Sequence, residues 1–583
     1  MKKNIKNIGV NYKKIIRILI DVDKKVLLFL FITTLINGIV PAISIAFTQK
    51  ILNAVQTICF PLNILMGIVC AYIVFNVLST FFSIIQQYYT SLFQYKLDQY
   101  INMLILEKAG DLSLRDYENA ESYDKIQRAK ASNKIYSYFS YFLSIIELIV
   151  TLIMYIYMLM SWKWWVIFVI IFVSIISAML MNRVNEYRYE MLRERTGEER
   201  EKWYYQFLLT NDLAFKEIKT YNLMKYFIDK YEKIYIKFLN QDKQYLKKMS
   251  KISVIKSIQE EIVSAFCLVL IILDTYAGKI LIGDSVAYIN VTNSVKNVIR
   301  LLLQQFSSIY NDSLYISQIF ELLSLPSERY YYKGTREIGS IKEIVLKNVS
   351  YKYSGCNEYA LENVSLVLKT EMMVALVGAN GSGKSTLVKI ISGLYTEYEG
   401  EVFVNGINLK DIDILSFRKQ ISTLFQDYTK YELSLRENIA IGNIENISND
   451  AEIKAVLNRV GLKKISNLDQ RLGVWFDNGI QLSGGEWIKV GLGRAFFKNS
   501  SLIILDEPDA SLDGVAETEI YKQITLLSKD KICLFITHHL TRIPKETQYV
   551  VLEKGKIVGT GTHEKLVKDC KVYKELYLAK ETK

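Results

Sequence analysis

The sequence predicts an α-helical domain with six membrane spans, followed by an α/β domain built around a phosphate-binding loop. Three observations support this prediction. Hydrophobic residues make up 50% of the 583 residues and the mean hydropathy is +0.14, which is too apolar for an ordinary soluble protein. Long apolar runs fall within residues 26–309, and residues 378–386 fit a glycine-rich phosphate-binding pattern.

The N-terminal segment is basic. Lysines are interspersed with isoleucines at roughly helical spacing through residues 1–25, which predicts an amphipathic helix at a membrane surface. The apolar run at about 26–47 is long enough for a bilayer span, which takes about 20 residues, and too long for a signal peptide. The other predicted spans are 62–85, 139–160, 164–181, 261–282 and 286–309.

The connections between the spans alternate in length and charge. Short links each hold one lysine, whereas the connections at 86–138 and 182–260 are dense in lysine and arginine. The positive-inside rule therefore places the long loops, both termini and the α/β domain on the cytoplasmic side of the plasma membrane, with lipid around the spans. The formal charge of +12 is spread along the chain instead of forming one basic module, so no nucleic-acid partner is expected.

Two spans carry polar residues at helical spacing. Because such residues are costly in lipid, they are expected to face the interior of the bundle. They fit two interpretations equally well: a hydrated substrate cavity, or hydrogen bonds between helices together with a cytoplasmic extension of the last helix. The two stripes are Tyr72, Asn76, Ser79, Ser83 and Gln86 on the second span, and Asn290, Asn293, Asn297, Arg300 and Gln304 on the last.

The apolar runs shorten after Pro326. The predicted division is a membrane domain at residues 1–325, a polar linker at 326–340 and an α/β nucleotide-binding domain at 341–583. Six cysteines show no C-x-x-C spacing, which predicts free thiols in a reducing compartment, and not a disulfide or zinc framework.

The phosphate-binding loop matches the pattern G-x-x-x-x-G-K-[ST] at every fixed position. A buried strand is expected before it and a helix after it, so backbone N–H groups and the helix N-terminus would meet a phosphate. Lys384 is expected to reach the β- and γ-phosphates of ATP, and the Ser385 hydroxyl to hold Mg²⁺. The predicted ATP-binding residues of the loop are Gly378, Ala379, Asn380, Gly381, Ser382, Gly383, Lys384, Ser385 and Thr386.

A second apolar strand, at 502–506, ends in two acidic residues. A strand this apolar is expected inside a parallel sheet, which would bring Asp506 and Glu507 to the edge beside the phosphates. Asp506 is expected to bind Mg²⁺, and Glu507 to polarise the attacking water as a general base. Without the phosphate loop, the same pair would fit a helix cap about as well.

These motifs resemble the nucleotide-binding domain of ATP-binding cassette (ABC) transporters, and six spans ahead of one such domain resemble a half-transporter of the exporter type. The segment 482–486 matches the family's signature, except that Glu486 stands where glutamine is usual. The resemblance implies that Ser483, Gly484 and Gly485 contact ATP held by the opposite domain of a dimer.

The resemblance assigns further roles. It implies that Gln426 senses the γ-phosphate and Mg²⁺, that Tyr353 stacks on adenine, and that His538 bonds the γ-phosphate and holds the attacking water. His539 stands where arginine is frequent, residues 511–513 match the loop that communicates between two sites, and His563 belongs to a late motif interpreted as structural. Since the essential positions are all filled, a homodimer would hold two complete sites for ATP hydrolysis.

A narrower resemblance, to lanthipeptide exporters of the nisin and subtilin type, lies in the segments 117–124, 215–219, 425–433 and 475–476. It implies ATP-driven export of a modified lanthipeptide or bacteriocin precursor, with peptide-modifying enzymes as possible partners. No cysteine or histidine precedes the first span, so an N-terminal leader-cleaving cysteine protease is not expected. The alternatives are a lipid or multidrug exporter of the same architecture, or a membrane ATPase that regulates without transporting.

Overall fold

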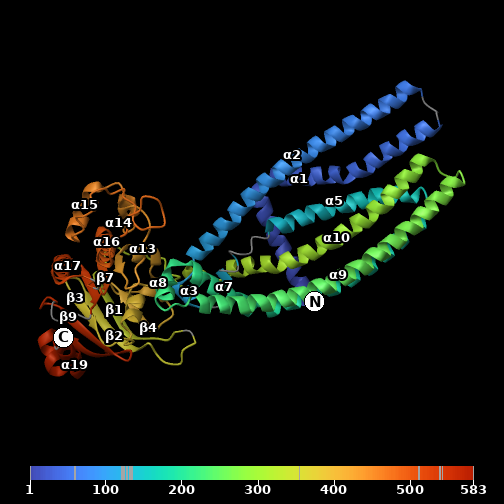
Figure 1. Ribbon diagram of the computed structural model, residues 1–583. Coiled ribbons are helices and arrows are strands. Elements are labelled where there is room, and N and C mark those ends of the chain that lie inside the picture. The colour runs from blue at the N-terminus through green and yellow to red at the C-terminus, as the bar shows by residue number, and fades with distance from the viewer. Residues whose placement is uncertain are drawn as a thin grey trace. The chain divides into compact units, whose positions relative to one another are not determined.

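The computed structural model describes residues 2–581 except 58–60, 120–121, 123–124, 127–128, 130–134, 354, 510–511, 538–539 and 541–542. It divides into two compact units (Figure 1). The first comprises residues 1–106 and 127–323, and the second comprises 107–126 and 324–583. The larger segment of the second unit starts at residue 324, close to the predicted boundary at Pro326. The unit also includes residues 107–126, which lie in the sequence between the two segments of the first unit.

The first unit is built of long helices. α5 packs against both α1 and α10, and α9 packs against α6, α7 and α10. Apolar side chains of α5, α6, α9 and α10 form its largest described core, in which Val291 and Val295 are completely buried. The helices are α1 (Lys2–Thr57), α2 (Leu62–Gly110), α5 (Ile135–Met160), α6 (Trp164–Glu194), α7 (Thr196–Thr210), α8 (Asp212–Thr220), α9 (Met224–Tyr276) and α10 (Ile282–Leu323).

The N-terminal segment is helical as predicted, and of the isoleucines whose side chains are described some are buried and others, Ile16 and Ile20, are exposed. Ile15 and Ile18 are buried, and the Lys14 ammonium lies 5.2 Å from the centre of the Phe320 ring of α10. The helix kinks at Asp23, whose carboxylate accepts a hydrogen bond from the Val26 N–H at 3.1 Å and so caps the part of α1 that continues as the first span.

Four described helices are long and apolar enough to cross a membrane. Their spans are Lys14–Thr57, Leu62–Gly110, Ile135–Met160 and Trp164–Leu192. The sixth predicted span lies within α10, and the fifth lies in α9 up to Tyr276 and then enters the connection to α10. The helical membrane domain is thus confirmed, while the count of six spans stays a prediction.

The two polar stripes have different surroundings. On α2, Gln86 donates to Thr34 Oγ1 of α1 at 3.2 Å, and the Tyr72 hydroxyl lies 3.5 Å from Ser44 Oγ of α1. Two members of the α2 stripe thus form hydrogen bonds between helices, whereas Ser79 and Ser83 donate to carbonyl oxygens of α2 itself. On α10, Asn290, Asn293, Asn297, Arg300 and Gln304 are all exposed within this chain. The same helical periodicity has placed two residues of one stripe against α1 and left the other stripe exposed.

The second unit contains two sheets. The antiparallel sheet has the strand order β2-β1-β4-β5, and the larger sheet has the order β10-β9-β3-β8-β7-β6, in which every neighbouring pair except β10 with β9 is parallel. The strands are β1 (Glu343–Tyr351), β2 (Leu361–Lys369), β3 (Met373–Val377), β4 (Glu399–Val404), β5 (Ile407–Asn408), β6 (Ile421–Leu424), β7 (Leu502–Asp506), β8 (Ile532–Ile536), β9 (Gln548–Glu553) and β10 (Lys556–Gly561).

The helices of the second unit lie between and after these strands in the chain, except α3 and α11, which precede β1. Every residue of β3, β7 and β8 is buried, as expected for parallel strands covered on both faces. Their carboxyl ends meet at one edge, where the phosphate loop, Asp506 and Thr537 lie. The helices are α3 (Leu114–Glu118), α11 (Glu328–Tyr331), α12 (Lys384–Ile391), α13 (Ile414–Lys419), α14 (Leu435–Ala440), α15 (Asp450–Arg459), α16 (Gly484–Phe497), α17 (Gly514–Leu527), α18 (His563–Asp569) and α19 (Lys571–Glu581).

Candidate nucleotide site

The phosphate loop connects β3 to α12, as the pattern predicts. Gly378 has no room for a side chain, because a Cβ there would lie 2.3 Å from the Leu552 carbonyl oxygen. Gly383 adopts φ +102°, a left-handed conformation that favours glycine, and so directs the chain into α12. Asn380 and Gly381 are exposed on the loop, whereas Thr386 is buried on the helix.

Lys384 is held inside the loop. Its side chain is buried, and its ammonium donates to the carbonyl oxygens of Gly378 and Ala379, each at 2.9 Å. Within the described residues, the buried Ser382 hydroxyl has no hydrogen-bond partner. A loop with an enclosed ammonium and an unpaired hydroxyl suits a multiply charged anion such as a phosphate chain.

Asp506 ends β7 in a buried position beside this loop. Burial and the adjacent Glu507 carboxylate raise the pKa of Asp506 to about 6, while the Lys384 ammonium and a hydrogen bond from Ser385 oppose that rise. No group of three or more histidine, cysteine or acidic side chains that could hold a metal occurs among the described residues. The pair Ser385 and Asp506 nevertheless fits Mg²⁺, which usually takes one or two protein ligands and completes its shell with phosphates and water.

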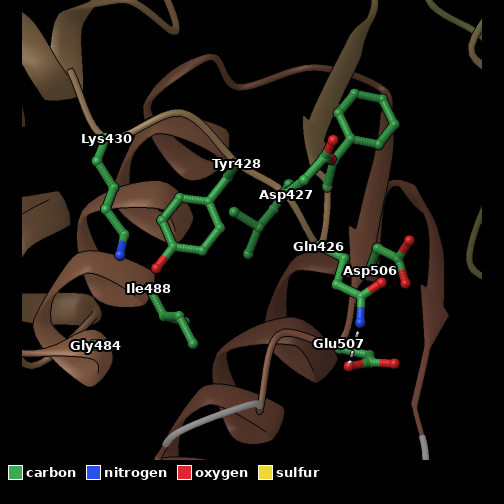
Figure 2. A pocket seen from close by; sticks show the side chains of 10 residues that line it. Gln426, Asp427, Tyr428, Lys430, Gly484, Ile488, Asp506 and Glu507 are labelled. Atoms are coloured by element: carbon green, nitrogen blue, oxygen red, sulfur yellow. Dashed lines mark hydrogen bonds between the residues drawn. The ribbon is translucent and has the colours of Figure 1, made fainter. Parts of the chain in front are cut away.

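Glu507 and Gln426 face each other across the site. Gln426 Nε2 donates to Glu507 Oε2 at 3.2 Å, as Figure 2 shows. Glu507 adopts φ +50°, and its N–H donates to the Ile536 carbonyl oxygen at 2.9 Å. A left-handed conformation is uncommon for a residue with a side chain and is often found at functional sites. This turn directs the Glu507 carboxylate toward Gln426.

A buried network, missed by the sequence analysis, supports this turn. Tyr521 of α17 and Thr537, which follows β8, each donate a hydroxyl hydrogen bond to Asp509 Oδ2 at 2.8 Å. Burial and the Asp509 carboxylate raise the pKa of Tyr521 above its usual value. The network ties the chain just after Glu507 to the residue that precedes His538. No spacing in the sequence indicates it, because its members come from three separate elements.

The start of α16 lines the same pocket as Gln426, Asp506 and Glu507. Figure 2 shows Tyr428 and Lys430 extending from the loop after β6 toward α16, where Gly484 and Ile488 complete the lining. The pocket thus brings together three of the predicted motifs. Asp427, Tyr428 and Lys430 also line it, although the sequence analysis gave them no role.

Ser483 and Glu486 of the signature form a capping box at the N-terminus of α16. Ser483 Oγ accepts from the Glu486 N–H at 3.3 Å, while Glu486 Oε2 accepts from the Ser483 N–H at 2.8 Å and from its hydroxyl at 2.9 Å. The backbone and hydroxyl of Ser483 lower the pKa of Glu486. Glu486, which stands where glutamine is usual, therefore provides an acceptor for the Ser483 N–H at the start of α16, whose first residues are Gly484 and Gly485.

Tyr353 lies beside the phosphate loop. Its hydroxyl is 2.9 Å from Thr386 Oγ1 of α12, and its ring packs edge-on against Tyr351. Ser511, His538 and His539 lie outside the described residues. His563 is the first residue of α18, and its Nδ1 lies 2.8 Å from the hydroxyl of Tyr573 on α19.

Comparison with known proteins is consistent with this geometry. The family model described as "ABC transporter" matches residues 361–510. The subtilin transport ATP-binding protein SpaT of Bacillus subtilis is 36% identical over 570 residues, covering 97% of this chain and 93% of its own length. This chain belongs to the ABC transporter family. As an ABC transporter with an ATP-binding domain, it is an ATP hydrolase coupled to transport and a multi-pass membrane protein.

Other relatives of this ABC transporter agree. The nisin transport ATP-binding protein NisT of Lactococcus lactis subsp. lactis is 34% identical, covering 97% of the chain and 95% of its own length. An ATP-dependent lipid A-core flippase of Pseudomonas fluorescens is 31% identical over 56% of the chain and 55% of its own length. A bacterial Atm1-family ABC exporter solved with ATP bound shares the fold, with a TM-score of 0.83, 16% identity and coverage of 96% of this chain and 98% of that one.

Proposed function

We propose that two copies of this chain form a homodimer that exports a modified lanthipeptide or bacteriocin precursor across the plasma membrane. The observation that supports this choice of substrate is the similarity to the subtilin and nisin transport proteins over 97% of the chain. The ATP-binding unit would lie in the cytoplasm, and the six predicted spans would lie in lipid. Peptide-modifying enzymes are the partners expected to supply the substrate.

Each ATP would be held by the phosphate loop of one copy. Lys384 would exchange its two carbonyl partners for the β- and γ-phosphates, since a phosphate chain offers an ammonium stronger charge-assisted hydrogen bonds. Ser385 and Asp506 would hold Mg²⁺, which supplies charge neutralisation at the phosphates. Tyr353 would stack on the adenine.

Hydrolysis would use the groups gathered at the sheet edge. Glu507 would accept the proton of the attacking water, and Gln426, already bonded to Glu507, would orient that water and contact Mg²⁺. His538 would bond the γ-phosphate. In the second copy, Ser483, Gly484 and Gly485 would meet the γ-phosphate, so that hydrolysis requires two chains.

The open polar stripe of α10 provides the substrate path. In a single chain its asparagines are exposed, whereas Val291, Val295 and Val298 on the other face are buried. Since exposed amides are costly in lipid, we place the stripe at the interface of two copies, lining a hydrated cavity that suits a peptide backbone.

A lipid or drug exporter is the second candidate, favoured by the flippase similarity over about half of the chain. ATP-dependent uptake into inside-out membrane vesicles distinguishes the two, using a leader-bearing modified peptide and a fluorescent lipid as probes. We expect uptake of the peptide and none in vesicles carrying Glu507→Gln. Uptake of the lipid alone would overturn the proposal that the substrate is a peptide. Absence of all uptake, with ATP hydrolysis intact, would favour a regulatory membrane ATPase.

A further inference from the structure

The segment 107–126 is tied to the phosphate-loop helix through one carboxylate. Glu118, the last residue of α3, accepts from the Tyr395 hydroxyl at 2.7 and 3.0 Å. Lys389 of α12 donates to the same carboxylate at 2.9 Å and lies 3.1 Å from the Tyr395 hydroxyl. All three residues belong to one compact unit. Glu118 therefore contacts the helix that begins with the phosphate-binding lysine.

Tyr395 also connects Glu118 to the predicted base-binding residue. Its ring stacks on Tyr351, with centroids 4.7 Å apart and planes at 10°, and meets Tyr353 edge-on at 6.0 Å. The Tyr353 hydroxyl returns to α12 through Thr386 at 2.9 Å. The contacts form a closed ring, in which α3, the tyrosine cluster and the phosphate-loop helix each constrain the others.

The ring depends on Glu118 because Tyr395 is almost fully enclosed. Its side chain is 2% exposed, and burial together with the Glu118 carboxylate raises its pKa, so that the phenol stays protonated and donates. A neutral amide in place of the Glu118 carboxylate would weaken the charge-assisted hydrogen bonds from the Tyr395 hydroxyl and the Lys389 ammonium, which are about twice as strong as neutral ones. Tyr395 would then shift, and its contact with Tyr353 would shift with it.

We propose that Glu118 is a positioning residue for the nucleotide: by holding Tyr395 and Lys389, it orients the Tyr353 ring and the end of α12 for base binding. Because coupling between two binding events is reciprocal, nucleotide binding also strengthens the docking of α3. This inference rests on the proposed role of Tyr353 at the adenine.

Steady-state ATP hydrolysis by the full-length protein in lipid nanodiscs tests the inference. Glu118→Gln is expected to raise KM for ATP by about fivefold, the low end of typical coupling, while kcat changes by less than about twofold. The matched control is Glu397→Gln. Glu397 pairs with Arg115, also on α3, but lies outside the ring of contacts, so its loss should leave KM unchanged. Equal increases in KM for both variants would mean that general loosening of α3 explains the effect, and would overturn the inference.

Hydrogen exchange measures the reverse effect, that of nucleotide binding on the segment that contains α3. A non-hydrolysable ATP analogue should increase protection of the amides in residues 107–126 of the parental protein and leave those of Glu118→Gln unchanged. Equal protection in both would contradict the coupling. Tyr353→Ala tests the base-stacking role of Tyr353 separately from the role of Glu118. An unchanged KM for ATP in Tyr353→Ala would contradict both the base-stacking role of Tyr353 and the inference that rests on it. A raised KM in Tyr353→Ala together with a parental KM in Glu118→Gln would overturn only the inference about Glu118.

Discussion

Tyr521→Phe tests whether the buried network around Asp509 supports the catalytic edge. The change removes one of the two hydroxyl donors that contact the Asp509 carboxylate, both at 2.8 Å, in a region where Tyr521 is 2% and Asp509 6% exposed. A hydrogen bond to a charged group contributes about 1.5–3 kcal/mol. Each kcal/mol shifts Tm by about 2–4 °C in domains of about 150–250 residues, and at that rate we expect a loss of about 3–12 °C for this unit of 280 residues.

The assay is thermal unfolding of the full-length protein in nanodiscs, followed together with the rate of phosphate release. Tyr359→Phe is the matched control. The Tyr359 hydroxyl also donates to a carboxylate, that of Glu399 at 3.3 Å, but Tyr359 is 38% exposed and water can replace the partner. We expect Tyr521→Phe to lower both Tm and kcat, because Asp509 follows Glu507 by two residues. Equal shifts of Tm in the two variants would show that the Asp509 network stabilises the fold no more than an exposed hydrogen bond does.

Three further changes probe the site and the cavity. Glu507→Gln should bind ATP with parental affinity yet lose about 10²-fold or more in kcat, measured by nucleotide binding and phosphate release, since only the general base is lost; parental turnover would remove Glu507 from that role. Lys384→Ala should weaken nucleotide binding itself, seen by titration with a fluorescent ATP analogue, and unchanged affinity would contradict its phosphate contact. Replacing Asn293 and Asn297 with leucine should reduce peptide transport more than ATP hydrolysis. Equal losses would indicate a packing role for these asparagines.

The motif-bearing edge of the second unit could be predicted from the sequence because its chemistry depends on short spacings. The run before Gly378 and the run before Asp506 are apolar at every position, which is typical of buried parallel strands. A glycine loop after the first run and two acids after the second must then lie at the same edge. The strand order and parallel pairing confirm this arrangement.

Contacts between distant segments could not be predicted in the same way. Glu118 is an ordinary polar residue at the end of a five-residue helix, and its bonds to Lys389 and Tyr395 span more than 270 positions. Likewise the polar stripes of α2 and α10 share a periodicity, yet only the fold shows that Gln86 faces α1 while Asn293 stays exposed. Periodicity identifies a face of a helix, and tertiary packing decides what covers it.

The N-terminal helix shows the same limit. Basic residues among isoleucines are typical of a membrane-surface helix, and the sequence analysis expected one. The structure buries Ile15, Ile18 and Leu19 and leaves Ile16 and Ile20 exposed, so the position at a membrane surface stays a prediction. An amphipathic pattern fits either a lipid surface or a neighbouring helix, because both bury one apolar face.

In the proposed function, ATP hydrolysis at the assembled site drives peptide export by two copies of this chain without another subunit. The most direct test reconstitutes the purified protein in proteoliposomes and follows accumulation of a leader-bearing modified peptide together with phosphate release. We predict that both require ATP and Mg²⁺ and that both are lost in Glu507→Gln. Phosphate release by the parental protein without any accumulation of peptide would contradict ATP-driven peptide export by this chain.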